Sequence, residues 1–407
     1  MMKERMIKKI GIKKFLYVLP TLGIGGAELQ TINQLNYFQE NEINNFSLVI
    51  LSDKVDKKCA SSLMLPREKM FVIGINNMEV ISSKSLFASF KAVKNLSKII
   101  IQTKSNSVLA VLLISQWVTR LTKVYHFITF KPTFEIISYY RGLDYQLFLK
   151  KKFYLRIFNT VNKAMAFFTD NKSVFISGAV KNDVVKHFYV NNSSIIIHNS
   201  LPEVKVDSVA GQAYLQEYGI QKNIFVLVVP GVVNAAIKGH FFFVEAFKLF
   251  LSRKSISPKE FKVIIAGDGP DFEKLKVLIS KYELSDYFIF NGFMQNNDLL
   301  SLFNVIDLVV VPSISEGFGN VIIEALRQQA LILASDTGGI PEIIKDGKNG
   351  LLFKSNNIGS LVERLSYVYK NKGVGIIDKE EMKNSFKSKF TLETQIANIV
   401  EFLSLKF

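Results

Sequence analysis

The sequence predicts an α/β protein with two domains, each built on a parallel sheet that helices cover on both faces. Short, continuous apolar runs alternate with helical stretches along the chain, a pattern typical of buried parallel strands. The chain has 407 residues, and domains hold about 100–200 residues each. Charge also divides the chain, since residues 1–200 hold 28 Lys+Arg and 12 Asp+Glu, whereas residues 201–407 hold 23 of each.

The first domain is expected over residues 1–200. Its predicted strands are 15–19, 46–51, 69–75, 108–113, 134–138, 173–177 and 194–198. Helices are expected between them, for example at 27–39 and 85–103. The stretch 201–222 has no strong apolar run and is predicted to be the linker between the domains.

The second domain is expected over residues 201–390. Its predicted strands are 224–229, 261–266, 287–290, 308–311 and 331–334. Predicted helices are 240–251, 272–281, 297–303 and 320–328, and a last helix is expected around 391–405. The same alternation of strands and helices as in the first half predicts a second parallel sheet.

Composition excludes several classes of protein. A single cysteine, Cys59, excludes a disulfide scaffold and a multi-cysteine metal site. No apolar run approaches the 18 or so residues of a membrane-spanning helix. The basic N-terminus imitates a signal peptide, but the apolar run 15–19 is too short for one and reads as a strand. We therefore expect a cytoplasmic protein.

The formal net charge of +16 admits a polyanionic partner. Nucleic acid is not expected, because no recognition motif or aromatic-basic repeat occurs and Lys150–Lys152 is the longest basic run. The basic first half instead predicts contact with an anionic membrane surface.

A glycine-rich turn follows the first predicted strand. It runs Gly23-Ile-Gly25-Gly26-Ala27-Glu28 and opens a helix, where backbone amides can bind phosphate. A dinucleotide fingerprint needs a third glycine where Glu28 stands, so NAD binding is disfavoured. Two interpretations remain: a tight strand-to-helix turn, or a backbone at Gly25 and Gly26 that lines a cleft.

Lys238 and Gly239 follow the predicted strand 224–229 and open a helix. A lysine at that edge of a sheet can neutralise a phosphate. A solvated surface lysine is the alternative.

The segment 311–326 is the most informative. Glu316 and Glu324 flank the turn Gly317-Phe318-Gly319-Asn320, which opens a helix whose N-terminus favours an anion. Glu316 alone could be a helix cap. That explanation does not cover Glu324, which lies in an apolar run where an unpaired charge is costly.

Two further glycine-rich connections complete the set, Ala266-Gly-Asp-Gly-Pro270 and the segment 334–352 with Gly338-Gly-Ile-Pro-Glu-Ile-Ile344. In this order the motifs resemble family 4 glycosyltransferases with the GT-B fold, in which two Rossmann-like domains face each other across a cleft. The resemblance covers nearly the full length and is strongest from about 224 to 352. It also implies that the helix in 391–407 packs back on the N-terminal domain.

The resemblance implies a role for each matched position. Lys238 would bind the donor diphosphate, and the amides of Gly317, Phe318, Gly319 and Asn320 would hold the diphosphate or the sugar. Glu316 would contact the sugar hydroxyls as the catalytic residue, and Glu324 the ribose. Gly25 and Gly26 would border the reacting phosphate and the acceptor.

Family members retain the anomeric configuration and use neither a bound metal nor a cofactor besides the nucleotide-sugar donor. The sequence independently contains no Asp-x-Asp, and its four histidines show no ligand spacing. We expect a glycan or lipid-linked acceptor, and composition suggests bacterial surface polysaccharide or lipopolysaccharide synthesis. The protein would then work in the cytoplasm, peripherally at the inner face of the membrane.

Three positions depart from the family pattern. Val232 stands where a diphosphate-binding arginine is usual. Arg141 lies where many members have a cleft histidine, and it would either supply charge there or lie on the surface. Gln329-Ala-Leu331 replaces a Gly-x-Pro turn.

Two alternatives remain beside the transferase. One is a glycosyltransferase-like non-catalytic subunit, for which Val232 is the support. The other is a nucleotide-sugar epimerase or hydrolase on the same fold, which needs a carboxylate and histidine set that the sequence lacks.

Overall fold

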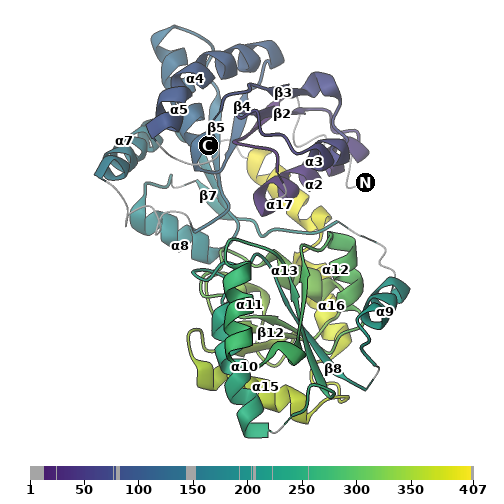
Figure 1. The fold of residues 1–407 in the computed structure, drawn as a ribbon. Helices are drawn as coiled ribbons and strands as arrows, with labels where there is room; N and C mark the ends of the chain where they lie inside the picture. Colours follow the sequence, from purple (N-terminus) through teal and green to yellow (C-terminus); the bar gives the residue numbers. More distant parts are fainter. Residues whose placement is uncertain are drawn as a thin grey trace. The chain divides into compact units, whose positions relative to one another are not determined.

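The computed structural model describes residues 13–404, apart from 24, 77, 79–82, 144–152, 192, 203, 205–207, 222 and 255. The chain divides into two compact units (Figure 1). Unit 1 comprises Met1–Pro202 with Leu392–Phe407, and unit 2 comprises Glu203–Thr391. Each unit is built on one parallel sheet, which confirms the predicted fold class. The signal-like basic segment before residue 13 lies outside the described residues.

Unit 1 contains a seven-stranded sheet in the order β3-β2-β1-β4-β5-β6-β7. The strands are β1 Phe15–Leu19, β2 Phe46–Ile50, β3 Met70–Val72, β4 Ser107–Val111, β5 Glu135–Tyr140, β6 Lys172–Phe175 and β7 Ser194–Ile196. Every predicted run overlaps a strand, and the run at 15–19 is confirmed residue for residue. The third strand is shorter than the predicted 69–75, although beyond it the amides of Ile73 and Ile75 still donate to the carbonyls of Ile50 and Leu51, at 2.8 and 3.0 Å.

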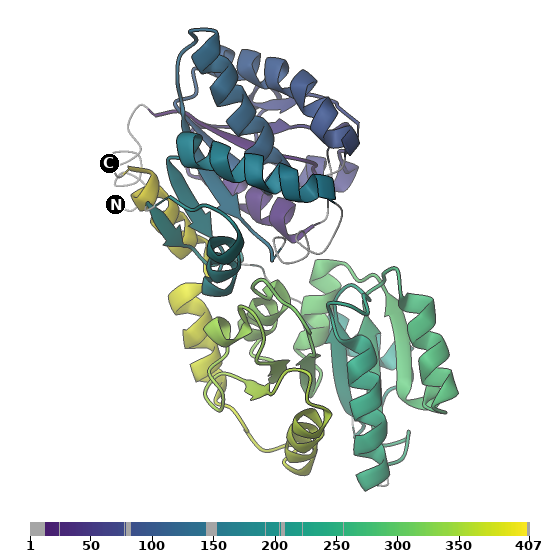
Figure 2. The same cartoon turned by 90° about the vertical axis from the view of Figure 1, so that its left-hand side faces the viewer.

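Helices cover both faces of this sheet. They are α2 Gly26–Glu40, α3 Lys57–Ser62, α4 Ser83–Thr103, α5 Leu113–Ile128, α7 Phe153–Thr169 and α8 Gly178–His187, with the short helix η1 Arg67–Lys69. Helix α5 contacts both α4 and α7, so these three form one layer (blue to teal in Figure 2).

The last helix, α17 Leu392–Ser404, belongs to unit 1 and packs on α2. A buried amide network fixes it there. Gln34 donates from Nε2 to Oε1 of Gln395 at 2.9 Å, and Gln395 donates to the carbonyl of His198 at 2.7 Å. Because buried amides must find partners, this network sets the position of α17 along α2.

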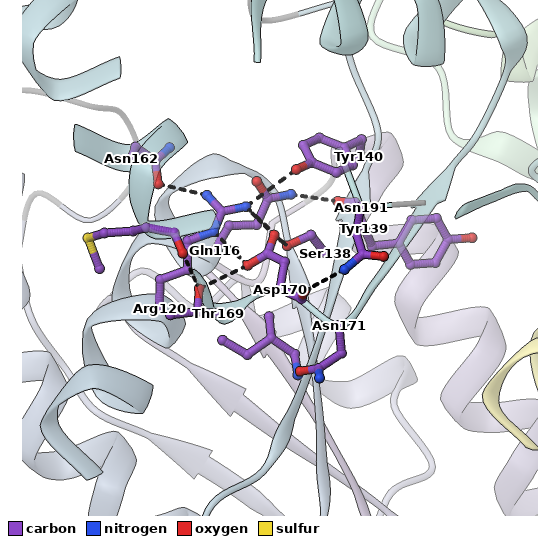
Figure 3. A network of polar contacts seen from close by, with 12 residues as sticks. Gln116, Arg120, Ser138, Tyr139, Tyr140, Asn162, Thr169, Asp170, Asn171 and Asn191 are labelled. Atoms are coloured by element: carbon purple, nitrogen blue, oxygen red, sulfur yellow. Dashed lines mark hydrogen bonds and ion pairs between the residues drawn. The ribbon is translucent and has the colours of Figure 1, made fainter. Parts of the chain in front are cut away.

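A buried ion pair joins α5 to the loop after α7 (Figure 3). Arg120 is fully buried and donates to both carboxylate oxygens of Asp170, at 2.9 and 2.6 Å. Asn162, Ser138 and Tyr140 accept its remaining hydrogen bonds, at 2.7, 3.2 and 3.3 Å. The guanidinium on α5 is therefore bonded at once to α7, to the residue that follows α7 and to β5, and no sequence pattern indicated it.

Unit 2 contains a six-stranded sheet in the order β10-β9-β8-β11-β12-β13. The strands are β8 Phe225–Pro230, β9 Phe261–Ala266, β10 Phe288–Gly292, β11 Leu308–Val311, β12 Ile332–Ser335 and β13 Leu351–Phe353. The helices are α9 Ser208–Glu217, α10 His240–Lys254, α11 Phe272–Lys281, α12 Asn296–Phe303, α13 Asn320–Arg327, α14 Ile340–Ile343, α15 Ile358–Lys370 and α16 Lys379–Lys389, with η2 Ser285–Tyr287.

Two elements of unit 2 differ from expectation. The stretch predicted to be a featureless linker contains α9, which packs on α12. Gly211 allows this contact, because a side chain there would overlap the carbonyl of Ser301. The other is the three-residue strand β13, which is too short to give an apolar run and was not predicted.

Helix α13 is followed by Gln329-Ala-Leu331, the stretch that replaces the Gly-x-Pro turn of the family. Gln329 adopts φ 56°, in the left-handed region that favours glycine. The amide of Ala330 donates to the carbonyl of Ala325 at 3.1 Å, which is the bond of a Schellman cap. The helix therefore ends in a Schellman cap with a strained glutamine at the position that favours glycine.

We predict that Gln329→Gly stabilises unit 2 by about 1 kcal/mol, because glycine adopts the left-handed conformation without a Cβ clash. Circular dichroism during urea denaturation measures the gain. The fluorescence of Trp117, the only tryptophan, should not change, since it reports unit 1. Gln329→Ala is the control and should give no gain; equal gains from both variants would contradict the explanation.

We also predict that Arg120→Met destabilises unit 1 by about 3–5 kcal/mol, because it leaves the carboxylate of Asp170 buried and without its cation. The double variant Arg120→Met, Asp170→Leu should recover part of that loss. Trp117 fluorescence in urea measures both. A double variant that loses the full sum of the two single changes would disprove the coupling.

Candidate functional site

The candidate site of unit 2 lies at the carboxyl edge of its sheet. Strands β8, β11 and β12 are neighbours and parallel. The loops that leave them, 231–239, 312–319 and 336–339, therefore start at the same edge, where open α/β sheets bind ligands. Most residues predicted for donor binding stand in the first two loops.

Backbone contacts hold these three loops against one another. The amide of Ile314 donates to the carbonyl of Ile237 at 2.7 Å, which ties the middle loop to the first. The amide of Gly339 donates to the carbonyl of Glu316 at 3.1 Å, which ties it to the third. Ser335 adds a hydrogen bond from its Oγ to the carbonyl of Ser313, at 2.6 Å.

Two glycines permit this approach. A side chain on Gly239 would overlap the carbonyl of Pro312, and one on Gly338 would overlap the carbonyl of Glu316. Both residues also have positive φ angles, 70° and 56°. Gly239 and Gly338 thus allow the middle loop to be enclosed by backbone on both sides.

Lys238 and Glu316 form the central ion pair of the site. The ammonium Nζ lies 2.7 Å from Oε2 of Glu316, and the two side chains are 29% and 13% exposed. Ser313 donates to the same oxygen at 3.2 Å. Lys238 is thus no solvated surface lysine, and the helix-cap explanation of Glu316 is wrong, because Gly319 occupies the cap position of α13.

The turn 317–320 leads from this pair into α13. Gly319 adopts φ 112°, which a residue with a side chain rarely adopts. Phe318 is buried, with its ring centroid 6.0 Å from that of Phe390. Asn320 begins the helix. Packing of Phe318 therefore fixes the turn and directs the positive end of the α13 dipole to the edge of the sheet.

Glu324 lies one turn into α13, next to Arg327 one turn later. Burial raises the pKa of the Glu324 carboxyl to about 7, although the Arg327 charge opposes the rise. Such a carboxyl titrates near neutral pH and can accept hydrogen bonds in its ionised form.

His240, the first residue of α10, was predicted only not to bind metal. It is fully buried, and both ring nitrogens lack a hydrogen-bond partner within the described part of the chain. Burial lowers its pKa to about 4, and the charge of Lys238 adds to the effect. The imidazole is neutral at physiological pH, so Lys238 is the cation of this loop. The signal that could have found His240 is its place directly after Lys238-Gly239.

The predicted residues of unit 1 lie around the start of α2. Gly25 is the cap residue and Gly26 the first residue of that helix. Arg141, which follows β5, is 9% exposed and donates to the carbonyl of Ala27 at 2.9 Å and to Gln34 at 3.3 Å. The surface interpretation of Arg141 is therefore wrong. Its guanidinium also lies 4.2 Å from the centroid of the Tyr139 ring, which fixes it against the first turn of α2.

Among the described residues, no group of three or more His, Cys, Asp or Glu side chains is placed to hold a metal ion. None of the described helices is both long enough and apolar enough to span a bilayer.

Residues 212–389 match the family model of glycosyl transferases group 1. The alpha-D-kanosaminyltransferase of Streptomyces kanamyceticus is 34% identical over 163 residues, 39% of this chain and 41% of that protein. The N-acetyl-alpha-D-glucosaminyl L-malate synthase of Bacillus anthracis is 26% identical over 139 residues, 33% of this chain and 36% of that protein. The chain thus matches less than half the length of these relatives.

Solved structures resemble nearly the whole chain. Anabaena HepE in complex with UDP-glucose has a TM-score of 0.76 at 18% identity and covers 96% of this chain and 99% of its own. A Rickettsia africae glycosyltransferase has a TM-score of 0.74 at 20% identity, with coverage of 96% and 97%. The lipopolysaccharide outer core galactosyltransferase WaaB has a TM-score of 0.70 at 19% identity, with coverage of 97% and 100%. The chain has the GT-B fold of two Rossmann-like domains, and residues 212–389 match the model of glycosyl transferases group 1.

Proposed function

We propose that the protein is a retaining family 4 glycosyltransferase that moves a sugar from a nucleotide-diphosphate donor to a glycan or lipid-linked acceptor without a bound metal. The ion pair of Lys238 and Glu316 carries the proposal. It places one cation and one carboxylate at the carboxyl edge of the sheet, within the stretch that matches group 1 glycosyl transferases. The printed title of the HepE structure, which names UDP-glucose, supports a nucleotide-sugar donor.

The donor diphosphate would meet Lys238. Departure of the nucleoside diphosphate builds negative charge on its terminal phosphate, which a fixed cation stabilises more in the transition state than in the bound donor. The N-terminal ends of α10 and α13 add the positive ends of two helix dipoles. Val232 adds no charge where relatives usually have arginine, so these groups would carry the stabilisation.

Two carboxylates would orient the donor. Glu316, already held by Lys238 and Ser313, would accept hydrogen bonds from sugar hydroxyls beside the diphosphate. Glu324 would accept hydrogen bonds from the ribose. Because Phe318 and Gly319 fix the turn between them, both carboxylates would keep their positions during transfer.

Unit 1 would bind the acceptor near Gly25 and Gly26. The buried Arg141 would position the first turn of α2 through its bonds to Ala27 and Gln34, and its Nε, which has no partner among the described residues, would be available to the acceptor. A role in bacterial surface polysaccharide or lipopolysaccharide synthesis is supported by the likeness to WaaB. Lipid-linked acceptors are reached at a membrane, and so we also propose a cytoplasmic protein attached peripherally to its inner face.

We predict that Lys238→Ala and Glu316→Ala each lower the rate of sugar transfer by about 10²–10³ or more, as removal of one preorganised electrostatic group does. Nucleotide release from a panel of UDP-, GDP- and ADP-sugars, with and without lipid-linked acceptors, measures the rate. Lys259→Ala, a change of an exposed lysine in the same unit, should leave the rate unchanged.

Circular dichroism should show that all three variants remain folded. Full activity of both site variants would reject the assignment of the ion pair. If the wild-type protein binds none of these nucleotide sugars, the non-catalytic subunit that Val232 suggests would replace the transferase.

We predict that donor affinity depends on the ionisation of Glu324. With a pKa raised to about 7, the carboxylate accepts hydrogen bonds from ribose mainly above neutral pH, so UDP-glucose affinity should rise about tenfold from pH 6 to pH 8. Calorimetric titration across that range measures it. Glu324→Gln should bind more weakly at pH 8 and lose the dependence; an unchanged pH profile in this variant would show that another group titrates.

A further inference from the structure

The outer surface of unit 1 exposes large apolar side chains on helices α4, α5 and α7. Phe87 on α4 is 82% exposed, Phe127 at the end of α5 84% and Phe168 at the end of α7 80%. Phe130, directly after α5, is 96% exposed. Neighbouring helix positions add Phe90, Ile101, Ile128, Ile157, Val161 and Phe167. The exposed side chains of these three helices, together with Lys104 and Phe130, form a surface that we call the outer helical face. Figure 2 shows the three helices that carry it.

The outer helical face carries only positive charge. Residues 83–134 and 153–169 contain no aspartate or glutamate. The exposed basic residues on it are Lys84, Lys91, Lys94, Lys98, Lys104, Arg156 and Lys163. Within the described part of the chain, none of the seven takes part in an ion pair. Among the described residues, their charges are therefore not compensated by ion pairs and can attract an anionic partner.

Helix α4 shows how the two kinds of side chain combine. Its solvent-facing stripe has a spacing of three or four residues, which is one face of a helix. Along it stand Lys84, Phe87, Lys91, Lys94, Lys98 and Ile101, in that order. The opposite side contributes Ala92, Leu96 and Ile100 to the core. At a membrane surface, exposed apolar side chains and basic side chains both add to binding, the first by burial in the acyl boundary and the second by attraction to anionic lipids.

We infer that the protein docks on an anionic lipid bilayer through the outer helical face, with the phenylalanine tips in the acyl boundary and the lysines at the phospholipid headgroups. The inference extends the proposed membrane attachment and is independent of the transfer chemistry. A second copy of this chain fits poorly, because two acid-free faces repel each other. Double-stranded nucleic acid would use the lysines for its phosphates but leave the phenylalanines of α5 and α7 in water.

Sedimentation of the full-length protein with lipid vesicles tests the inference. Vesicles of equal parts phosphatidylglycerol and phosphatidylcholine should bind the protein at low salt, and vesicles of phosphatidylcholine alone should bind it far less. Each lysine near such a surface contributes about fivefold in affinity. The affinity of the triple variant Lys91→Glu, Lys94→Glu, Lys98→Glu for these vesicles should therefore fall by about a hundredfold or more.

A matched control makes the same change of charge in unit 2, at Lys259, Lys281 and Lys387, which are exposed and outside the ion pairs of the described residues. This control should keep most of the binding. Phe127→Ser with Phe130→Ser tests the apolar part and should weaken binding about tenfold or more. Nucleotide-sugar binding by unit 2 should be unchanged in every variant, which separates this result from failure of the proposed transferase.

Three results would overturn the inference: equal binding to neutral and anionic vesicles, equal loss in the triple variant and in its unit 2 control, or vesicle binding that survives both outer-face variants. Light scattering adds a fourth. If the wild-type protein is a dimer that does not bind vesicles, and if the double variant Phe127→Ser, Phe130→Ser is a monomer, the outer helical face would be assigned to a second copy of the chain.

Discussion

The close packing of backbone against backbone at the carboxyl edge of the unit 2 sheet is the constraint on which the site depends. The loop after β11 lies between the loops after β8 and β12, and its carbonyls at Pro312 and Glu316 occupy the space where side chains of Gly239 and Gly338 would stand. This packing carries Lys238 to within 2.7 Å of Glu316, a residue 78 positions later in the chain. Without this packing, water would solvate the two charges, and a solvent-exposed ion pair contributes little to stability.

The sequence predicted most of the fold because buried parallel strands leave continuous apolar runs, as at 15–19, 261–266 and 308–311. It failed where the signal was short or set by tertiary contact. Strand β13 has only three residues, and α9 is held by packing on α12 through Gly211. Site residues could be proposed from motifs, but the pairing of Lys238 with Glu316 and the burial of His240 arise from how loops meet, which no local pattern encodes.

Unit 1 uses its polar groups in two opposite ways. Inside, Arg120 with Asp170 and Gln34 with Gln395 are hydrogen-bonded and connect helices to strands and to α17. Outside, α4, α5 and α7 present lysines and phenylalanines that nothing in the described structure covers. The sequence analysis interpreted the positive charge of the first half of the chain as a sign of membrane contact. In the structure, this charge is clearest on the helices α4, α5 and α7, which contain no acidic residue.

Hydrogen–deuterium exchange with and without a nucleotide sugar is the most direct measurement of the central claim, that the loops around Lys238 and Glu316 hold the donor. With a sugar nucleotide that the protein accepts, amides in 231–240 and 312–324 should gain protection, while those of α4 should not change. Protection confined to unit 1, or none in either loop with a nucleotide sugar that the protein demonstrably consumes, would contradict the account.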